Sequence, residues 1–280
     1  MGGRLSQFLP VWQKHLKLSR WHRRALTEGV PIEWIPGIDL GTNSPFDSAL
    51  RYPEGSKERL ACSKTLQHYI DIGAVEVLPS DTEGGLWHTF FPVPKKGTDK
   101  MRGCVDLRKP NSAIQYRHFK MEGLHTVAQL ARPGDLAVTV DMSDFYMHWH
   151  IRPKDRSKLR FMWEGVKCQC TAMPFGLAPA PRLSTKLFQP VLRALRAMGL
   201  RLVSYIDDIL LMSRSVQGCL RQGQLLVDFL TMLGFEVHPD KCCLIPSHTR
   251  IFLGTQVNFS LMQFREKKKK IRSVRREIDQ

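Results

Sequence analysis

The sequence lacks the long apolar segments that cross membranes. Its 280 residues contain no run of about 18 or more apolar residues, the length that a transmembrane helix requires. The first residues, Met1-Gly2-Gly3-Arg4, also lack the apolar core of a secretory signal. We therefore expect an intracellular protein, in the cytoplasm or the nucleus, with no membrane partner.

Paired cysteine motifs are absent as well. The seven cysteines are odd in number and scattered along the chain. Neither Cys168-Gln169-Cys170 nor Cys242-Cys243 belongs to a set with the spacing of zinc ligands. Reduced, mostly structural thiols are the expectation for such a chain.

Acidic residues are few relative to basic ones. There are 42 Lys and Arg against 26 Asp and Glu, which gives a net charge of +16. This excess suits a polyanionic partner, most commonly nucleic acid. Part of it is local, because residues 265–276 are densely basic with only Glu266 opposing. A solvated helix face or a nuclear-localisation patch explains that run at least as well as a specific contact does.

The elements that are present form a mixed pattern. Apolar residues fall at helical spacing in three segments, residues 57–72, 183–198 and 217–233. Strands are expected over residues 90–94, 101–107, 136–141, 200–203, 209–212, 235–238 and 251–259. Residues 1–56 are interrupted by Pro and Gly and predict an irregular arm. Without regular βαβ alternation, this pattern favours an α+β fold with a largely antiparallel sheet.

Two adjacent carboxylates stand where two of these strands meet. Tyr205-Ile206-Asp207-Asp208 lies between the apolar runs 200–203 and 209–212. Neighbouring anions against a hydrophobic hairpin repel each other and lose hydration, so a cation is expected to compensate them. Magnesium is a natural candidate because it prefers carboxylate and phosphate oxygens. A polar turn without metal is the alternative, since Asp is common in turns.

A third acid strengthens the metal hypothesis. Asp141 ends the apolar strand that contains Val138-Thr139-Val140. In two-metal nucleotidyl transfer, carboxylates from more than one strand hold the ions that activate a 3′-hydroxyl and stabilise the leaving pyrophosphate. Asp141, Asp207 and Asp208 would supply that set if their strands lie side by side.

Six motifs in order resemble the reverse transcriptase domain of retroelements. They are residues 102–111, 141–146, 173–177, 205–208, 233–241 and 252–254, and the resemblance covers roughly residues 57–265. The residues Gly2-Gly3-Arg4-Leu5, the loop 175–182 and the short spacer before Tyr205 are most similar to DIRS-type, tyrosine-recombinase retrotransposons.

The resemblance implies a right-hand polymerase fold with fingers, palm and thumb. Residues 1–56 would form the N-terminal arm, and residues 57–135 the fingers with the start of the palm. Residues 136–250 would form the palm, with a fingers insertion at about 152–172. Residues 251–280 would form the primer-grip hairpin and the start of a truncated thumb. No ribonuclease H domain is expected within this chain, although polyproteins of this family usually continue into one.

The resemblance also assigns the carboxylates and their neighbours. Asp141 and Asp207 would be the main ligands of two Mg²⁺ ions, with Mn²⁺ as a possible substitute, and Asp208 would be a secondary acid. Tyr205 would pack near the primer end. Lys241 matches a Lys proposed to protonate the leaving pyrophosphate, and a surface Lys is the alternative.

The substrate-binding residues follow in the same way. Lys95, Lys96 and Arg102 lie on or beside a basic hairpin that closes over the incoming triphosphate in this family. An exposed charged turn is the alternative, and the choice between Lys95 and Lys96 stays open. Tyr146 resembles the aromatic gate that excludes a 2′-hydroxyl, although a core aromatic is compatible with it. Phe175 and Gly176 would line the pocket near base and template.

One further motif carries metal-ligand residue types. In His148-Trp149-His150 the two histidines would share one face of a strand, as residues i and i+2 do. No third ligand is evident, so a structural role is expected.

The function that these residues predict is RNA-directed DNA polymerisation, with an RNA template, a DNA primer, a dNTP and magnesium. A catalytically weak or inactive nucleic-acid-binding fragment of a polyprotein is the alternative from another class. Intact Asp141, Asp207 and Asp208 argue against it. An RNA-dependent RNA polymerase would have the same arrangement of catalytic acids on its palm, but Tyr146 and the Phe175-Gly176 loop argue against that function.

Overall fold

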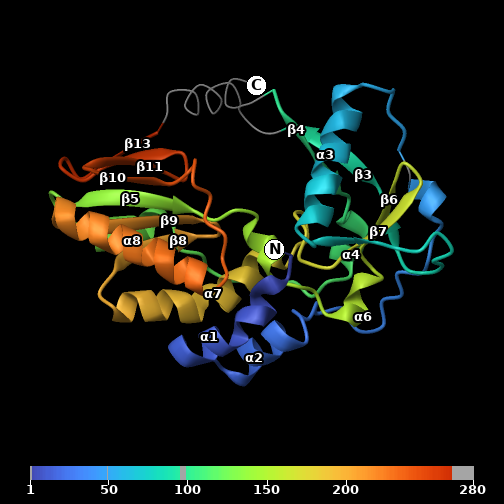
Figure 1. Ribbon diagram of the computed structural model, residues 1–280, viewed down its shortest axis with the longest axis horizontal. Coiled ribbons are helices and arrows are strands. Elements are labelled where there is room, and N and C mark those ends of the chain that lie inside the picture. Colours follow the sequence, from blue (N-terminus) through green and yellow to red (C-terminus); the bar gives the residue numbers. More distant parts are fainter. Residues whose placement is uncertain (1, 49, 95–98, 267–280) are drawn as a thin grey trace. The chain divides into compact units, whose positions relative to one another are not determined.

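The protein is described from a computed structural model, which covers residues 2–48, 50–94 and 99–266 (Figure 1). Internal contacts divide the chain into two compact units. Unit 1 comprises Met1–Phe119 and Tyr146–Leu187, and unit 2 comprises Lys120–Phe145 and Phe188–Gln280. Among the described residues, no helix combines the length and apolar character needed to cross a bilayer.

Unit 1 contains two sheets and a set of mostly short helices. Four strands form one sheet in the order β1-β7-β6-β2, in which only β6 and β2 are parallel, and β3 and β4 form an antiparallel hairpin. The helical elements are η1 (Arg4–Phe8), α1 (Leu9–His15), α2 (Arg20–Thr27), η2 (Pro45–Ser48), α3 (Lys57–Asp71), α4 (Arg108–Ser112), η3 (Phe145–His148, shared with unit 2), α6 (Pro153–Arg156) and the first half of α7 (Ala180–Ala197). The strands are β1 (Val75–Val77), β2 (Trp87–His88), β3 (Phe90–Pro94), β4 (Met101–Val105), β6 (Arg160–Trp163) and β7 (Val166–Cys170).

The N-terminal segment differs from the expected irregular arm. Residues 4–27 form η1, α1 and α2, and they are anchored by large buried side chains. Trp12 is fully buried and packs edge-on against Trp149, with ring centroids 5.9 Å apart. The segment that follows is tied to β2, because the side-chain amide of Asn43 exchanges two hydrogen bonds with the backbone of Trp87, of 2.8 and 2.9 Å. Pro10 lies in the first turn of α1, where proline is tolerated, so the proline that suggested an irregular arm is compatible with a helix.

The predicted hairpin of residues 90–107 is present as β3 and β4. Its register pairs Phe90 with Val105 and Pro94 with Met101. A side chain at Gly103 would collide with the Phe90 ring, so the aromatic core of unit 1 requires glycine there. Phe90 in turn stacks on Phe161, with ring centroids 4.9 Å apart. The hairpin tip at residues 95–98 lies outside the described residues.

Unit 2 is built on an antiparallel four-stranded sheet in the order β10-β5-β9-β8. Three further strands, β11-β12-β13, form a second antiparallel sheet. The strands are β5 (Leu136–Asp141), β8 (Arg201–Tyr205), β9 (Asp208–Ser213), β10 (Cys243–Ser247), β11 (Thr249–Phe252), β12 (Thr255–Asn258) and β13 (Gln263–Glu266); the helices are α5 (Leu124–Leu130), α8 (Val216–Met232) and the second half of α7.

Both faces of the β10-β5-β9-β8 sheet are covered, so its central strands are apolar throughout. Figure 1 shows α8 crossing one face, where Gly223 permits close approach: an added Cβ would lie 3.4 Å from a Val138 methyl. On the other face Leu210 and Met212 join a buried cluster with Phe252 and Val257 of the second sheet. This double burial explains why the sequence around β9 reads as a continuous apolar run and not as an alternating one.

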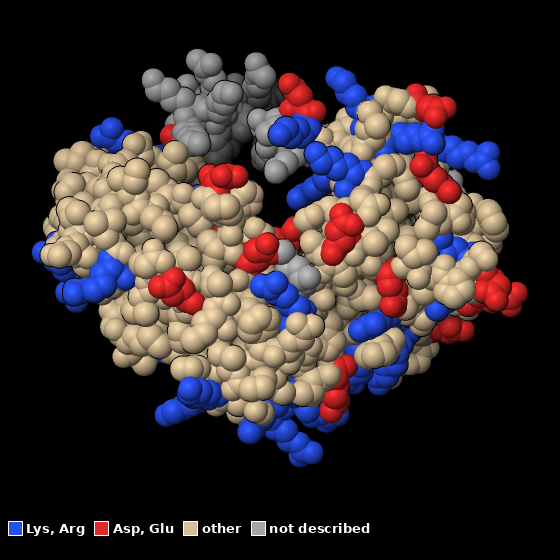
Figure 2. Space-filling view, viewed as in Figure 1, with Lys and Arg blue, Asp and Glu red and all other residues tan. Residues whose placement is uncertain are grey.

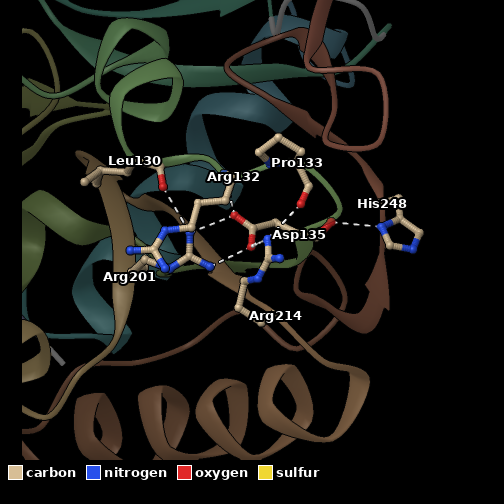
Figure 3. A network of polar contacts seen from close by, with 7 residues as sticks. All are labelled: Leu130, Arg132, Pro133, Asp135, Arg201, Arg214 and His248. Atoms are coloured by element: carbon tan, nitrogen blue, oxygen red, sulfur yellow. Dashed lines mark hydrogen bonds and ion pairs between the residues drawn. The ribbon is translucent and has the colours of Figure 1, made fainter.

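A buried acid holds the start of β5 in place. The Asp135 carboxylate is fully buried, and Arg201 on β8 donates to both of its oxygens at 2.7 Å (Figure 3). It also accepts the backbone N–H of Arg132 at 2.8 Å, and Arg214 lies 3.5 Å away. His248 of the β10–β11 turn contacts the Asp135 backbone carbonyl at 2.9 Å. Four separate segments of unit 2 therefore meet at this residue.

The α+β prediction with mostly antiparallel sheets agrees with the structure, but two local expectations do not. Residues 145–148 form the 3₁₀-helix η3 and not a strand. Residues 235–238 contribute one isolated bridge, between Val237 and Met142. The boundaries between the two compact units fall at 119/120, 145/146 and 187/188, while the predicted division into arm, fingers, palm and thumb stays a prediction. Such boundaries depend on contacts between distant segments, which local patterns do not show.

Candidate active site

Asp141 and Asp208 face each other across two central strands of unit 2. They are direct partners in the β5–β9 register, so their side chains leave the same face of the sheet. Asp207 is in the turn between β8 and β9, and its backbone carbonyl accepts the N–H of Met142 at 3.0 Å. The structure therefore brings the three predicted acids to one end of the sheet.

The turn that carries Asp207 is strained. Tyr205 and Asp208 are paired, which leaves a two-residue loop of Ile206 and Asp207. Ile206 adopts a left-handed backbone conformation, with φ of 56°. This conformation is unfavourable for a β-branched residue and costs on the order of 1–3 kcal/mol. The tight turn presents Asp207 directly beside Asp208, and the folded sheet must offset its cost.

The site is short of positive charge for its carboxylates. Burial, and after it the negative charges of Asp207 and Asp141, together raise the pKa of Asp208 to about 6. The pKa of Asp207 is also raised, mainly by burial and then by Asp141 and Asp144. Both shifts disfavour the charged form, so a bound cation would relieve them.

Lys241 supplies the nearest positive charge. Its ammonium lies 3.0 Å from Oδ1 of Asp141, and the Lys241 side chain is about half exposed. The segment before it is fastened to the end of β5, because the Asp141 carbonyl accepts the N–H of His238 at 2.8 Å. The Asp141 N–H points to Sγ of Cys242 at 3.3 Å. Sequence reasoning assigned no role to Cys242, which positions this segment through a contact 101 residues away in the chain.

The donor set fits a divalent cation, although it is not closed around one. In the part of the chain that the structure describes, no group of three or more His, Cys, Asp or Glu side chains is arranged to hold a metal ion. The Lys241 ammonium is paired with one Asp141 oxygen and is about half exposed. The charged forms of Asp207 and Asp208 are disfavoured, and carboxylates in this situation are suited to Mg²⁺. Metal binding by these three acids stays a prediction.

Three of the predicted substrate-binding residues, Arg102, Tyr146 and Phe175, form a row of contacts in unit 1. The Tyr146 ring packs edge-on against Phe175, with centroids 5.5 Å apart. Arg102 is on β4, and its guanidinium carbon lies 5.1 Å from the centroid of the Phe175 ring. Tyr146 is 9% exposed and Arg102 is exposed, so the row runs from a buried aromatic ring to a positive charge at the surface. A cation over an aromatic face is held in position while its N–H groups stay available for phosphate.

Asn111 shapes the loop that carries Phe175. Its side-chain amide donates to the Gly176 carbonyl at 2.8 Å, and its carbonyl accepts the Ala178 N–H at 2.8 Å. Gly176 has φ of 89°, a conformation open to glycine and strained for other residues. Asn111 was part of a recognised motif without an assigned role. Only the folded contact, 65 and 67 positions along the chain, reveals its function as a clamp.

The remaining predicted residues have simpler outcomes. Lys95 and Lys96 and the basic run after Glu266 lie outside the described residues. Tyr205 packs against the apolar cluster of unit 2. His148 is fully buried within η3, so the argument from a shared strand face was wrong for the 148–150 motif. All seven cysteines are free thiols.

Comparison with known proteins shows a family to which the chain is similar. Residues 93–257, more than half of the chain, match the family described as "Reverse transcriptase (RNA-dependent DNA polymerase)". The Gag-Pol polyprotein of gibbon ape leukemia virus is 24% identical over 214 residues, which are 73% of this chain and 12% of the polyprotein. That of Rous sarcoma virus subgroup B is 26% identical over 227 residues, 78% of this chain and 13% of the polyprotein. The chain thus spans only a small part of these relatives.

Solved structures show the same architecture. The foamy viral protease-reverse transcriptase in complex with double-stranded DNA has a TM-score of 0.66 and 18% identity, covering 97% of this chain and 48% of that one. The same enzyme with an RNA/DNA hybrid gives the same score and identity, with 37% of that chain covered. At this identity the likeness shows the fold, and the predicted right-hand polymerase fold is confirmed.

Proposed function

Because the chain belongs to the reverse transcriptase (RNA-dependent DNA polymerase) family, we propose that it is an RNA-directed DNA polymerase. The reaction is attack of a DNA primer 3′-hydroxyl on the α-phosphate of a dNTP, templated by RNA. The observation that carries the proposal is the placement of Asp141 opposite Asp208, with Asp207 in the adjoining strained turn.

Asp141 and Asp207 would hold the catalytic cations, with Asp208 in a secondary role. When bound, two Mg²⁺ ions, or Mn²⁺, supply activation of the attacking hydroxyl and stabilisation of the pyrophosphate oxygens. The chain's own contribution is to fix these carboxylates on paired strands, where their raised pKa values favour cation binding.

Lys241 has two roles in this proposal. It neutralises Asp141 while no cation is bound, as the 3.0 Å ion pair indicates. With that carboxylate holding a cation, the Lys241 ammonium would be placed to face the leaving pyrophosphate and donate a proton to it. General acids of this kind contribute about 10² to 10⁴ in rate.

The residues of unit 1 would bind the incoming nucleotide. Arg102, with Lys95 and Lys96 on the same hairpin, would contact the triphosphate. Tyr146 would lie against the sugar and exclude a 2′-hydroxyl, because Phe175 supports its ring from the side. Gly176, held by Asn111, would allow the backbone to approach the base and template.

The proposed macromolecular partners are an RNA template and a DNA primer. The similar foamy viral enzyme is titled as a complex with double-stranded DNA and with an RNA/DNA hybrid, which supports nucleic-acid partners here. The N-terminal Gly2-Gly3-Arg4-Leu5 and the loop 175–182 support the finer proposal of a DIRS-type element acting inside the cell. Reading frames for ribonuclease H and tyrosine recombinase beside the gene would test that assignment.

Primer extension tests the proposed activity. Purified protein should extend a DNA primer on an RNA template with dNTPs and Mg²⁺, and Asp207→Asn should abolish extension. Asp228→Asn is the matched control, because Asp228 is an exposed acid on α8 whose contact is a hydrogen bond from Gln224. No extension by the wild type, or equal extension by both variants, would contradict the proposal.

A further inference from the structure

The N-terminal segment of unit 1 is basic without any acidic residue. Residues 1–27 contain six Lys and Arg and no Asp or Glu. The first acid, Glu28, is already occupied, since the Arg24 guanidinium donates two hydrogen bonds of 3.0 Å to it. This segment lies outside residues 93–257, which match the family model. Its charge is therefore not explained by the polymerase motifs.

These charges are carried on a fixed framework. Trp12 and Leu26 are buried under α1 and α2. The Gly3 N–H donates to the Met147 carbonyl at 2.9 Å, and the Val30 N–H donates to the His150 carbonyl at 2.8 Å. Both ends of the segment are thus fastened to the same stretch of unit 1. The positions of the basic side chains relative to one another are set by this packing.

Four of the basic side chains lie outside every salt bridge of the described residues, although Glu28 acts on Arg20 at longer range. Lys14, Lys17, Arg20 and Arg23 are exposed on α1, on α2 and on the turn between them. None of the four forms an ion pair with a residue that the structure describes. Exposed positive charges on one helical pair repel each other, so a polyanion bound there would stabilise them.

Helix α7 adds a fifth charge to this surface. The Lys186 ammonium lies 3.9 Å from the centroid of the Trp21 ring. A ring nitrogen of His22 contacts the Lys186 carbonyl at 3.2 Å, which joins α2 to α7. Figure 2 shows Lys and Arg side chains projecting from the part of the surface over α1 and α2. We define Lys14, Lys17, Arg20, Arg23 and Lys186 as the N-terminal basic surface.

We propose that the N-terminal basic surface binds the phosphodiester backbone of nucleic acid. The contact is additional to the polymerase site and independent of polymerisation. It is expected to lack sequence preference, because phosphate contacts carry no base information and Lys186 covers the Trp21 face on which a base could stack. An anionic membrane is the less suitable partner. Interfacial helices insert a free apolar face, whereas that of α2 is buried through Ala25 and Leu26.

Salt-dependent binding tests the proposal. Affinity for a labelled single-stranded RNA is measured by fluorescence anisotropy from about 50 to 200 mM salt, without dNTP and with EDTA. Single-stranded DNA and duplex are measured in parallel. The test protein carries four substitutions, Lys14→Gln, Lys17→Gln, Arg20→Gln and Arg23→Gln. The control has the same net charge, with exposed residues changed elsewhere: Lys64→Gln, Lys154→Gln, Arg193→Gln and Arg221→Gln.

The expected difference follows from counterion release. Each lost phosphate contact lowers the salt slope by about 0.7 for single strands, so four contacts lower it by about 3. Over this fourfold salt range the wild-type Kd should therefore rise about 50-fold more than that of the test variant. The control variant should follow the wild type. If the two variants changed the salt dependence of Kd equally, binding would depend on net charge alone and the proposal would be overturned.

A measurement on the unmodified chain guards against misfolded variants. Lysine acetylation is followed by mass spectrometry with and without saturating RNA. Lys14, Lys17 and Lys186 should lose at least several-fold in labelling, while Lys64 should not change. Unchanged labelling of the three lysines at saturation would overturn the proposal. So would protection by vesicles of phosphatidylserine and phosphatidylcholine but not by RNA. Because neither assay includes dNTP, an absence of polymerase activity would leave both results interpretable.

Discussion

Replacing Asp135 with Asn should destabilise the protein more than any exposed ion-pair change. The carboxylate is fully buried and receives Arg201 at both oxygens, each at 2.7 Å. Asn keeps the volume of the side chain but removes its charge. The guanidinium of Arg201, whose side chain is only 20% exposed, would then lack a counter-charge.

The size of the effect follows from burial. Removing one member of a buried ion pair costs about 3–5 kcal/mol. The lower end of this range applies to Asp135→Asn for two reasons. Arg214 is largely exposed and can regain hydration, and the Asn side chain can still accept the Arg132 N–H. A loss of about 3 kcal/mol corresponds to a fall in Tm of roughly 6–12 °C for a chain of about this size.

The loss should also depend on pH in a defined direction. Burial alone would raise the pKa of Asp135, but hydrogen bonds from Arg201 and the Arg132 amide, with the charges of both arginines, lower it overall. A carboxyl whose pKa is depressed by folding stabilises the fold above its unfolded pKa of about 3.9, and this stabilisation is lost as the pH falls through the folded value. The difference between wild type and Asp135→Asn should persist at neutral pH and shrink below about pH 4.

Thermal and urea denaturation measure this difference. The control is Arg24→Gln, which breaks an exposed pair with Glu28 that has two hydrogen bonds of similar geometry. Exposed pairs contribute about 0–1 kcal/mol, so this variant should melt close to the wild type. If Asp135→Asn cost no more than Arg24→Gln at neutral pH, the reasoning from burial would be refuted.

Three further predictions concern the site. Tyr146→Ala should raise the ratio of ribonucleotide to deoxynucleotide incorporation, while Tyr146→Phe keeps it; an unchanged ratio for the Ala variant would remove the gate. Because folding raises the pKa of Asp208 to about 6, the metal-free wild type should lose stability as pH rises from about 4 to about 6. Asp208→Asn should show a shallower slope, to which the raised pKa of Asp207 still contributes. Lys241→Met should tighten Mg²⁺ binding by up to about fivefold in a thermal-shift titration. The reason is that the ion pair between Lys241 and Asp141, worth up to about 1 kcal/mol, no longer competes with the cation for the carboxylate. An unaltered Mg²⁺ midpoint would exclude this competition.

The catalytic strands could be predicted from sequence because their signals are local. The expected strand at residues 136–141 and the hairpin around 205–208 coincide with β5, β8 and β9. β5 and β9 are mostly apolar and buried, and the acids stand at the end of each strand nearest the turn. The helices α3 and α8 were equally accessible, because each presents apolar residues at regular spacing and is followed by a glycine, Gly73 or Gly234.

The remaining features depend on contacts between distant residues. Asp135 reads as an ordinary loop acid until Arg201, 66 positions later, is placed against it. The Lys241–Asp141 pair spans 100 positions, and the Asn111 clamp spans 65. In the N-terminal segment, α1 is held in place because the buried Trp12 ring packs against Trp149. Sequence reasoning gave weight to the prolines and glycines of the segment, and the contact that fixes it lies 137 positions away in the chain.

Single-turnover incorporation of one dNTP on an RNA template tests the central claim most directly. Wild type, Asp207→Asn and Asp228→Asn are mixed with primer–template and Mg²⁺, and one added nucleotide is followed with time. The account predicts equal rates for wild type and Asp228→Asn and a loss of at least several hundredfold for Asp207→Asn. Incorporation by Asp207→Asn at the wild-type rate would contradict the assignment of these carboxylates as the catalytic centre.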